Sequence, residues 1–393
     1  MVSVTKNNTP ALRFDGFGSE WEAKPLKNLG SSYGGLTGKT KEDFGHGDAR
    51  YITYLNVFEH AVIRDASQLG NTEIDNRQNE VKTGDVLFTV SSEVPEEVGM
   101  SAVWLGQGQS IYLNSFCFGF RPTTKLDSKF LAYVLRSPDF REKMTLLAQG
   151  ISRFNISKTR AMELEISLPT LEEQCAIGKL FAELDALIEQ HRAKHANLQQ
   201  AKTALMQRMF PQDGANEPEL RLGGFSGAWE PKKVDEICPL QRGFDLPASK
   251  MVEGSVPVVT SNGVVRHHNK ALVKGPGVTT GRSGSIGKVH FVEQDYWPHN
   301  TSLWVTDFKG NDPRFVYYLL QRIDPSRFSS GSGVPTLNRN DLHDFVSHIP
   351  PILEEQRAIG EVFADLDALI AAEQRYIAQL TQAKTALLQR MFV

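Results

Sequence analysis

The sequence predicts an α+β fold in which two globular modules alternate with two long helices that pair antiparallel as a coiled coil. Three observations predict it. A segment of about 40 residues occurs twice. Each copy carries an apolar stripe at heptad spacing, and the sequence between the copies mixes strand-like with helix-like segments. We therefore expect a pseudo-twofold internal repeat.

The repeated segment begins with Leu-Glu-Glu-Gln, at Leu171–Gln174 and again at Leu353–Gln356, and both copies end in Gln-Arg-Met-Phe. The register holds without a gap, with about two-thirds of the positions identical. A second repeat opens each half, where Trp21-Glu22 parallels Trp229-Glu230. Its offset is larger, so the first module is longer than the second. The helical segments and the module starts are alike in the two halves, whereas the module interiors differ. This favours modules that have been free to diverge in what they bind, and it disfavours duplication followed by simple drift.

These repeats predict the order of parts along the chain. Pro169 and Pro351 stand just before the repeated segments, as prolines do at helix starts. A helix of this size is about 60 Å long. We expect a flexible N-terminus at 1–11, a first module at 12–168, a first helical spacer at 169–210, a linker at 211–219, a second module at 220–350 and a second helical spacer at 351–393.

The apolar stripe needs a partner surface because a lone helix would leave it exposed to water. The other copy of the helix is the nearest candidate, and antiparallel pairing would relate the halves by a pseudo-twofold axis. His191 and Glu373 are equivalent polar interruptions of the stripe, and we expect them to face each other. The alternative is two separate helices, each packed on its own module. The heptad positions are Ile177, Leu184, His191, Leu198 and Leu205 in the first copy, and Ile359, Leu366, Glu373, Leu380 and Leu387 in the second.

Composition narrows the class of protein. The net charge is −3, so the chain is not basic as a whole, although local patches matter more for nucleic-acid binding. The three cysteines, Cys117, Cys175 and Cys238, lack the spacing of a zinc site and fit a reducing cytoplasm. Neither a signal peptide nor a membrane span is recognisable. We expect a cytoplasmic protein without a metal site.

The modules each mix strands and helices. In the first, Tyr51–Leu55 and Val86–Val90 predict strands, and residues 127–147 predict one or two helices. In the second, residues 256–259, 287–291 and 302–305 predict strands, and Pro313–Ile323 predicts a helix.

A glycine-rich loop at Thr279–Lys288 has the look of a nucleotide-binding loop but fails both common patterns. Position 282 is Arg and position 289 is Val, where the Walker pattern needs other residues, and the loop precedes a strand rather than the helix of a dinucleotide site. It predicts either a tight turn that carries Arg282 and Lys288 toward phosphates or base edges, or a plain hairpin turn.

Two stretches are locally basic. Residues 241–290 and 121–160 each carry several more cations than anions, which fits contacts to phosphates. Carboxylates, serines and histidines form no spaced catalytic constellation, and methyltransferase patterns of the Asn-Pro-Pro-Phe or Phe-x-Gly-x-Gly type do not occur. We therefore expect a chain that is not catalytic by itself.

The twice-occurring pattern Pro-x-Leu-Glu-Glu-Gln-x-x-Ile-Gly, followed by Leu-Asp-x-Leu-Ile and Gln-x-x-Lys-x-x-Leu-x-Gln-x-Met-Phe, resembles the specificity subunit of type I restriction–modification systems. The Trp-Glu pairs and the stretch Gly333-x-x-Thr336-Leu337-Asn338 add to this resemblance, which covers nearly the whole chain. The corresponding stretch of the first module, Gly150–Ser157, departs from that pattern.

The resemblance implies that each module is a target recognition domain for one half of an asymmetric, interrupted DNA site, and that the helices set the spacing and dock two modification subunits. Those partners would bind S-adenosylmethionine and methylate adenine, and restriction subunits would use ATP and Mg²⁺; this chain would bind no cofactor. For docking we expect Glu172, Glu173, Gln174, Glu354, Glu355 and Gln356. For DNA contact we expect Tyr33, Lys39, Lys41, Ser91, Ser92, Arg153 and Lys158 in the first module, and Ser261, Asn262, Arg266, His267, Asn269, Arg282 and Lys288 in the second.

Two other functions stay open at this point. A similar chain serves restriction systems with a fused nuclease–methylase, which only the partner's sequence would distinguish. The other function is a coiled-coil scaffold whose modules bind protein rather than DNA. Selection of bound DNA sequences with the reconstituted complex would separate this scaffold from a DNA-reading subunit.

Overall fold

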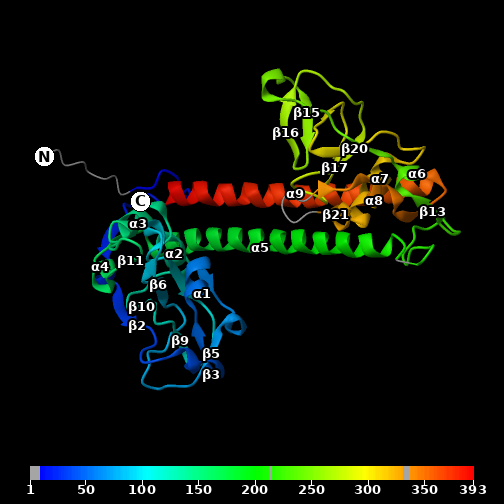
Figure 1. Ribbon diagram of the computed structural model, residues 1–393. Helices are drawn as coiled ribbons and strands as arrows, with labels where there is room; N and C mark the ends of the chain where they lie inside the picture. The colour runs from blue at the N-terminus through cyan, green and yellow to red at the C-terminus, as the bar shows by residue number, and fades with distance from the viewer. Residues whose placement is uncertain (1–8, 213, 331–335) are drawn as a thin grey trace. The chain divides into compact units, whose positions relative to one another are not determined.

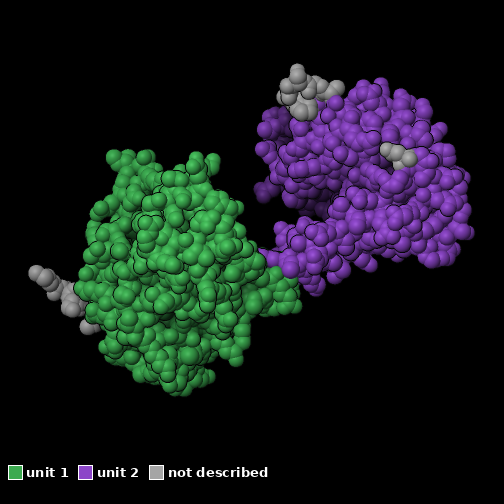
Figure 2. Space-filling view, turned by 90° about the horizontal axis from the view of Figure 1, so that it is seen from below, with its two compact units in different colours: residues 1–191, 376–393 green, residues 192–375 purple. Residues whose placement is uncertain are grey.

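The computed structural model describes residues 9–212, 214–330 and 336–393. The chain divides into two compact units, residues 1–191 with 376–393 and residues 192–375, which Figure 2 colours separately. Two long helices, α5 (Leu171–Arg208) and α9 (Leu353–Met391), each contribute residues to both units (Figure 1).

Within each unit the two helices run antiparallel, as the order of their contacts shows. In unit 1, residues farther along α5 meet residues closer to the start of α9. The ring of Phe181 lies 5.6 Å from that of Phe392, which directly follows α9; Asp185 pairs with Lys384, and the rings of His191 and Tyr376 lie 4.6 Å apart. In unit 2 the same order holds for Lys194 with Glu373, Lys202 with Asp367 and Phe210 with Phe363. The antiparallel pairing is confirmed, and separate helices on separate modules are excluded.

His191 and Glu373 belong to different units. His191 contacts Tyr376 in unit 1, and Glu373 forms an ion pair with Lys194 at 2.6 Å in unit 2. Their expected meeting stays a prediction.

The module of unit 1 is built on a five-stranded sheet in the order β2-β10-β6-β8-β4 and a three-stranded sheet in the order β5-β3-β9. Two short antiparallel pairs, β1 with β12 and β11 with β7, complete it. The strands are β1 (Glu22–Pro25), β2 (Gly30–Gly34), β3 (Phe44–Ile52), β4 (Val62–Ile63), β5 (Gly70–Thr72), β6 (Val86–Thr89), β7 (Ser91–Ser92), β8 (Ser101–Trp104), β9 (Ile111–Leu113), β10 (Cys117–Pro122), β11 (Phe154–Asn155) and β12 (Glu165–Leu168); the helices are α1 (Tyr54–Glu59), α2 (Ser128–Val134), α3 (Pro138–Thr145) and α4 (Lys158–Met162).

The module of unit 2 has a four-stranded sheet in the order β14-β20-β17-β18 and a three-stranded sheet in the order β16-β15-β19. Short pairs join β13 with β23 and β21 with β22. The strands are β13 (Glu230–Lys233), β14 (Leu240–Arg242), β15 (Val256–Thr260), β16 (Gly263–His268), β17 (Gly277–Gly281), β18 (Val289–Val292), β19 (Trp297–Pro298), β20 (Ser302–Val305), β21 (Ser329–Ser330), β22 (Thr336–Leu337) and β23 (Val346–Ile349); the helices are α6 (Val234–Ile237), α7 (Pro313–Ile323) and α8 (Arg339–Asp344).

The local signals explain most of these elements. Asp127 and Ser137 cap α2 and α3 with their side chains, and Asp312 caps α7, which spans the predicted residues. The strand predicted at Tyr51–Leu55 is wrong in its second half. Thr53 accepts a hydrogen bond from the Asn56 N–H and caps α1, so the chain turns into a helix at Tyr54.

Each module packs on the long helices through an equivalent set of four aromatic residues. In unit 1, the buried Trp21 packs with Phe130, Phe181 and Phe392. The equivalent set in unit 2 is Trp229, Phe315, Phe363 and Phe210. The opening repeat therefore supplies the tryptophan of each cluster, and the helical repeat supplies two phenylalanines.

Candidate nucleic-acid interface

Four segments meet at an equivalent place in each module, and we call this place the junction. They are the turn after a strand of the three-stranded sheet, the turn after a strand of the larger sheet, the residues that lead into a neighbouring strand of that sheet, and a segment before a short helix. Junction 1 comprises residues 52–55, 89–92, 114–117 and 153–156, and junction 2 comprises residues 259–262, 281–284, 299–302 and 336–337.

Backbone hydrogen bonds establish the equivalence of the two junctions. Three backbone bonds of unit 1 have a counterpart in unit 2. The bond from Asn114 N to Ile52 O (3.0 Å) matches that from His299 N to Val259 O (2.8 Å), and the bond from Val90 N to Phe116 O (2.9 Å) matches that from Arg282 N to Thr301 O (2.8 Å). The third match is Ile156 N to Val90 O (3.0 Å) with Leu337 N to Arg282 O (2.8 Å). The scaffold is thus the same in both modules. The side chains on it differ, because Tyr54, Leu55, Val90 and Phe116 stand where module 2 has Ser261, Asn262, Arg282 and Thr301.

Junction 1 borders an open hollow of about 410 Å³, whose lining includes three aromatic rings together with Ser91, Ser92, Arg153 and the carboxylates of Glu93 and Glu97. The Tyr54 hydroxyl donates to the Ser91 carbonyl at 2.8 Å and so fixes one wall. Arg153 donates from Nη2 to the Ser91 hydroxyl at 3.1 Å, and its guanidinium lies 5.5 Å from the centre of the Phe116 ring. Ser92 donates to Glu97 at 3.0 Å. Three of the seven residues expected for module 1, namely Ser91, Ser92 and Arg153, therefore meet here.

Junction 2 is polar where junction 1 is aromatic. The Ser261 N–H donates to the Thr301 hydroxyl at 3.3 Å, and His290 Nε2 lies 3.3 Å from the Ser261 carbonyl oxygen. Burial lowers the pKa of His290, which favours a neutral ring that donates to this carbonyl. A Cβ on Gly281 would clash with the Ser285 carbonyl oxygen, so only glycine allows the following loop to fold back. This loop joins the antiparallel strands β17 and β18, as a hairpin connection does.

The β15–β16 hairpin carries most of the other residues expected for module 2. β16 is an edge strand, and its four central residues are exposed, including Arg266 and His267. Asn262 is exposed at the turn, Asn269 is exposed just beyond the strand, and Lys288 is exposed on the β17–β18 loop. The exposed edge strand of such a hairpin fits the major groove of B-DNA, which admits a β-ribbon.

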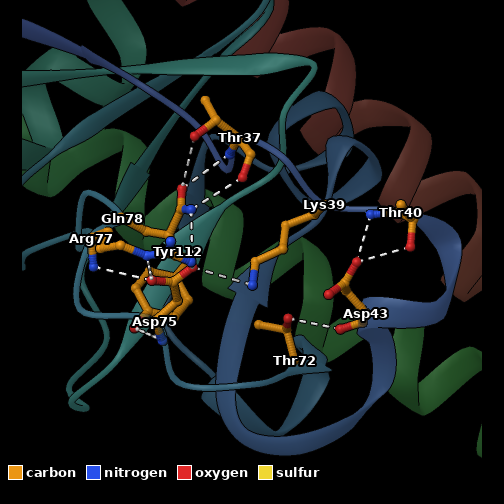
Figure 3. Close-up of polar contacts among 9 residues, drawn as sticks. All are labelled: Thr37, Lys39, Thr40, Asp43, Thr72, Asp75, Arg77, Gln78 and Tyr112. Atoms are coloured by element: carbon orange, nitrogen blue, oxygen red, sulfur yellow. Dashed lines mark hydrogen bonds and ion pairs between the residues drawn. The ribbon is translucent and has the colours of Figure 1, made fainter.

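Four expected residues of module 1 lie outside its junction. Tyr33 donates to Asp85 at 2.6 Å, and Arg121 pairs with the same carboxylate, so burial and Asp85 raise the pKa of Tyr33. Lys39 pairs with Asp75 at 3.3 Å with its side chain 12% exposed, and Figure 3 shows it extended toward that carboxylate. Tyr33 and Lys39 therefore make contacts within the module. Lys41 and Lys158 are exposed.

The polar cluster of Figure 3 holds together two loops of module 1. Asp75 accepts from Arg77 at 2.9 Å, and its N–H donates to the Tyr112 hydroxyl at 3.0 Å. Gln78 accepts from the Thr37 N–H at 3.0 Å. The hydrogen bond from the Arg77 side chain does most to keep the pKa of Asp75 well below its usual range. Asp75 is therefore a charged carboxylate at neutral pH.

The basic stretch of module 1 offers fewer free cations than its sequence indicates. Arg136 donates to four backbone carbonyls, those of Ser101, Val57, Phe58 and His60, and Arg141 donates to those of Glu96, Val98 and Gly99. Burial lowers the pKa of both to about 10, so they stay charged inside the module. In the basic stretch of module 2, by contrast, Arg266, Lys270, Lys274 and Lys288 are exposed.

The Leu-Glu-Glu-Gln motifs serve contacts within the chain. Glu173 is fully buried and accepts two hydrogen bonds from Arg13 at 2.6 Å, and Gln174 accepts from the Asp127 N–H at 3.1 Å. Glu355 and Gln356 make the matching contacts with Arg221 and the Asp312 N–H. Of the six residues expected to dock a partner, Glu172 and Glu354 are exposed.

Sequence reasoning missed Tyr54, Leu55 and Phe116. Leu55 is 60% and Phe116 54% exposed at the rim of junction 1. An exposed aromatic next to an arginine is a signal for nucleic-acid contact, but the two are 37 positions apart in sequence.

The described part of the chain holds no candidate site for a metal ion. Residues 9–212, 214–330 and 336–393 include no cluster of three or more His, Cys, Asp or Glu able to hold a metal ion. The cysteines are free thiols, and no described helix is both long and apolar enough to cross a membrane.

The fold and its two junctions define a class of internally duplicated proteins. In this class, a pair of antiparallel helices carries two modules that share a backbone scaffold and differ in their surface side chains. The sequence pattern of the family described as type I restriction modification DNA specificity domain matches residues 18–200 and 227–382. The chain belongs to this family.

Relatives and solved structures agree with this assignment. The proposed specificity subunit of the type I restriction enzyme MjaX, from Methanocaldococcus jannaschii, is 26% identical over 93% of this chain and 91% of its own length. The specificity subunit of the type I restriction enzyme MjaVIII, from the same organism, is 21% identical over 85% and 83%. The S subunit of a type I restriction–modification system from M. genitalium shares the fold, with a TM-score of 0.66, 18% identity and coverage of 98% of this chain and 99% of that chain.

Proposed function

We propose that this specificity subunit chooses the DNA sequence for a type I restriction–modification complex, with each module reading one half of an asymmetric, interrupted site. One observation carries the proposal. The two junctions share a backbone scaffold but present different side chains, aromatic in module 1 and polar in module 2. A shared scaffold with divergent surfaces suits two related readings of two different sequences.

Charge supports DNA as the ligand of module 2. Arg266 and His267 lie exposed on a β ribbon, with Lys288 exposed on a loop of the same module. Cations at the periphery would hold phosphates and set the register, and side chains in the junction would contact base edges. Methylation and cleavage would belong to the partner subunits, which would hold S-adenosylmethionine, ATP and Mg²⁺.

The docking of two modification subunits follows from the duplication. Glu172 and Glu354 are exposed at equivalent positions in the first turns of α5 and α9. Equivalent surfaces bind equivalent partners, so we propose one modification subunit at each helix start. The antiparallel helices would then set the distance between the half-sites, and one turn of B-DNA is about 34 Å.

Selection of DNA by the reconstituted complex tests this function. The chain is assembled with its modification subunit and incubated with a randomised pool of duplexes, and the bound DNA is sequenced. We expect a strongly enriched sequence. A pool that stays random, with a well-assembled complex, would indicate a scaffold that binds protein instead. Charge reversal of Glu172 and Glu354 together should weaken assembly, whereas reversal of the exposed Glu59 should not.

A further inference from the structure

Each junction contains one arginine, and the two arginines come from different segments. Arg282 occupies the scaffold position of Val90 in module 1, because both residues make the same pair of backbone hydrogen bonds. Arg153 comes from the segment that precedes β11 and donates to Ser91, the residue after Val90. The chain therefore brings a guanidinium to the same place of both modules by two routes.

These two arginines differ from three other arginines of module 1, whose donors are used inside the module. Arg121, Arg136 and Arg141 are held by a carboxylate or by several backbone carbonyls, so their donors are used internally. Arg153 is exposed, and among the described residues its guanidinium donates to the Ser91 hydroxyl alone, which leaves most of its five N–H donors for a ligand. Arg282 is half-buried, and in the described part of module 2 its side chain has no hydrogen-bond partner.

The setting of Arg153 also orients it. The guanidinium lies over the exposed Phe116 ring, which restricts its plane, and the Ser91 bond fixes one edge. A flat, oriented fork of donors matches the O6 and N7 acceptors that guanine presents in the major groove. A lysine at the same place would offer a point charge and no fork.

We propose that Arg153 and Arg282 are specificity-determining residues that each contact a guanine, Arg153 in the half-site of module 1 and Arg282 in the half-site of module 2. This inference rests on the proposed function and adds the residue and the base that it reads. The apolar rim of junction 1, formed by Leu55 and Phe116, would additionally favour a thymine methyl group beside that guanine.

The test uses the complete reconstituted complex and selection from a randomised duplex pool with wild type, Arg153→Ala, Arg282→Ala and Arg153→Lys. Each alanine variant should lose the preference for guanine at one position of one half-site, by on the order of tenfold to a hundredfold, with the other half-site unchanged. Arg153→Lys should keep overall affinity better than Arg153→Ala but lose the same preference. Arg160→Ala, at an exposed arginine of α4, is the matched control and should leave all base preferences intact.

Several outcomes would overturn the inference. Uniform weakening on all sequences, with a shallower dependence of affinity on salt, would make the arginine a phosphate contact. Loss at a position that is not guanine, effects of both variants on the same half-site, or an unchanged preference would also contradict it. If the wild-type complex enriches no sequence at all, the proposed function fails first, which distinguishes the two failures. Hydrogen exchange of the β6 and β17 amides shows whether each variant keeps its fold.

Discussion

Lys202 of α5 forms a 2.6 Å ion pair with Asp367 of α9, and the same aspartate accepts a 2.9 Å hydrogen bond from the Tyr318 hydroxyl of α7. In unit 1, Lys384, Asp185 and Tyr133 repeat this arrangement with the roles of the two long helices exchanged. Each aspartate thus joins both spacer helices to a helix of its module, which is α7 in unit 2 and α2 in unit 1. The repeat conserves this three-way contact within one chain, so we regard it as the polar element that fixes each module on the helix pair.

Removing that aspartate should loosen the module locally. Asp367→Ala leaves the Tyr318 hydroxyl, which is nearly buried, and the Lys202 ammonium without their acceptor. We expect a loss of about 1–3 kcal/mol in the stability of unit 2, seen as faster hydrogen exchange in α7. Asp365→Ala, at an exposed carboxylate two residues away, should change exchange in α7 little. Equal effects of the two variants would show that the three-way contact is unimportant.

The two equivalent glycines of the long helices should tolerate alanine differently. A Cβ on Gly178 would lie 2.6 Å from the Phe130 backbone nitrogen, whereas one on Gly360 would lie 3.1 Å from that of Phe315. Gly178→Ala must push α2 away from α5 and should destabilise unit 1 by about 1–3 kcal/mol. Gly360→Ala needs only a small adjustment and should cost clearly less in unit 2. Urea denaturation of both variants measures the difference, and a reversed order would refute this account of the packing.

The anchoring tryptophans should also respond unequally to phenylalanine. The Trp229 indole N–H donates to Glu355 at 3.3 Å, but the Trp21 indole nitrogen is buried without a hydrogen-bond partner among the described residues. Trp229→Phe removes a hydrogen bond to a buried carboxylate as well as packing, so it should cost about 1 kcal/mol more than Trp21→Phe. The free energies of unfolding of the two variants test this, and a larger loss at Trp21 would count against the assigned hydrogen bond.

Unit 2 should lose stability in mild acid through His343. Its Nε2 accepts a hydrogen bond from the Leu240 N–H at 2.9 Å, which requires a neutral ring. Burial lowers the pKa of His343, as does the nearby Arg339, against the smaller opposite effects of Asp235 and Asp344. The folded state therefore binds this proton less readily than the unfolded state, whose pKa is about 6.5. The contribution to stability is complete above that value and is lost as the pH falls below it toward the folded-state pKa.

His343→Gln should reduce this pH dependence. We expect the urea midpoint of the wild-type protein to fall between pH 7.5 and pH 5.5 by more than that of the variant. His267→Gln, at an exposed imidazole of β16, is the control and should follow the wild type. If His343→Gln keeps the full fall of the wild type, another group is responsible.

The sequence predicts the long helices and their pairing because the heptad pattern that causes them lies within one continuous segment of sequence. A heptad stripe repeated over α5 and α9 needs no knowledge of the modules, and capping residues such as Asp312 mark where α7 begins. The predicted strand at Tyr51–Leu55 is too long because the alternation of residues continues through Thr53, whose capping bond with Asn56 starts a helix instead.

The junctions were only partly predictable because their residues are far apart in sequence. The sequence predicts DNA contact for both Ser91 and Arg153, but only the folded module shows that they touch. Counting charges cannot separate Arg141, whose donors end on backbone carbonyls, from Arg153, which is exposed. The same limit applies to Glu173, whose place in a repeated motif gives no sign that Arg13 buries it.

Mapping of methylated adenines in DNA from cells that carry this chain and its modification subunit tests the central claim most directly. Two modules reading independently predict a modified sequence of two unlike blocks with a constant unread gap between them, and one modified adenine in each block on opposite strands. A single contiguous block, two identical blocks, or a gap of variable length would contradict the claim that each module reads its own half-site at a fixed separation.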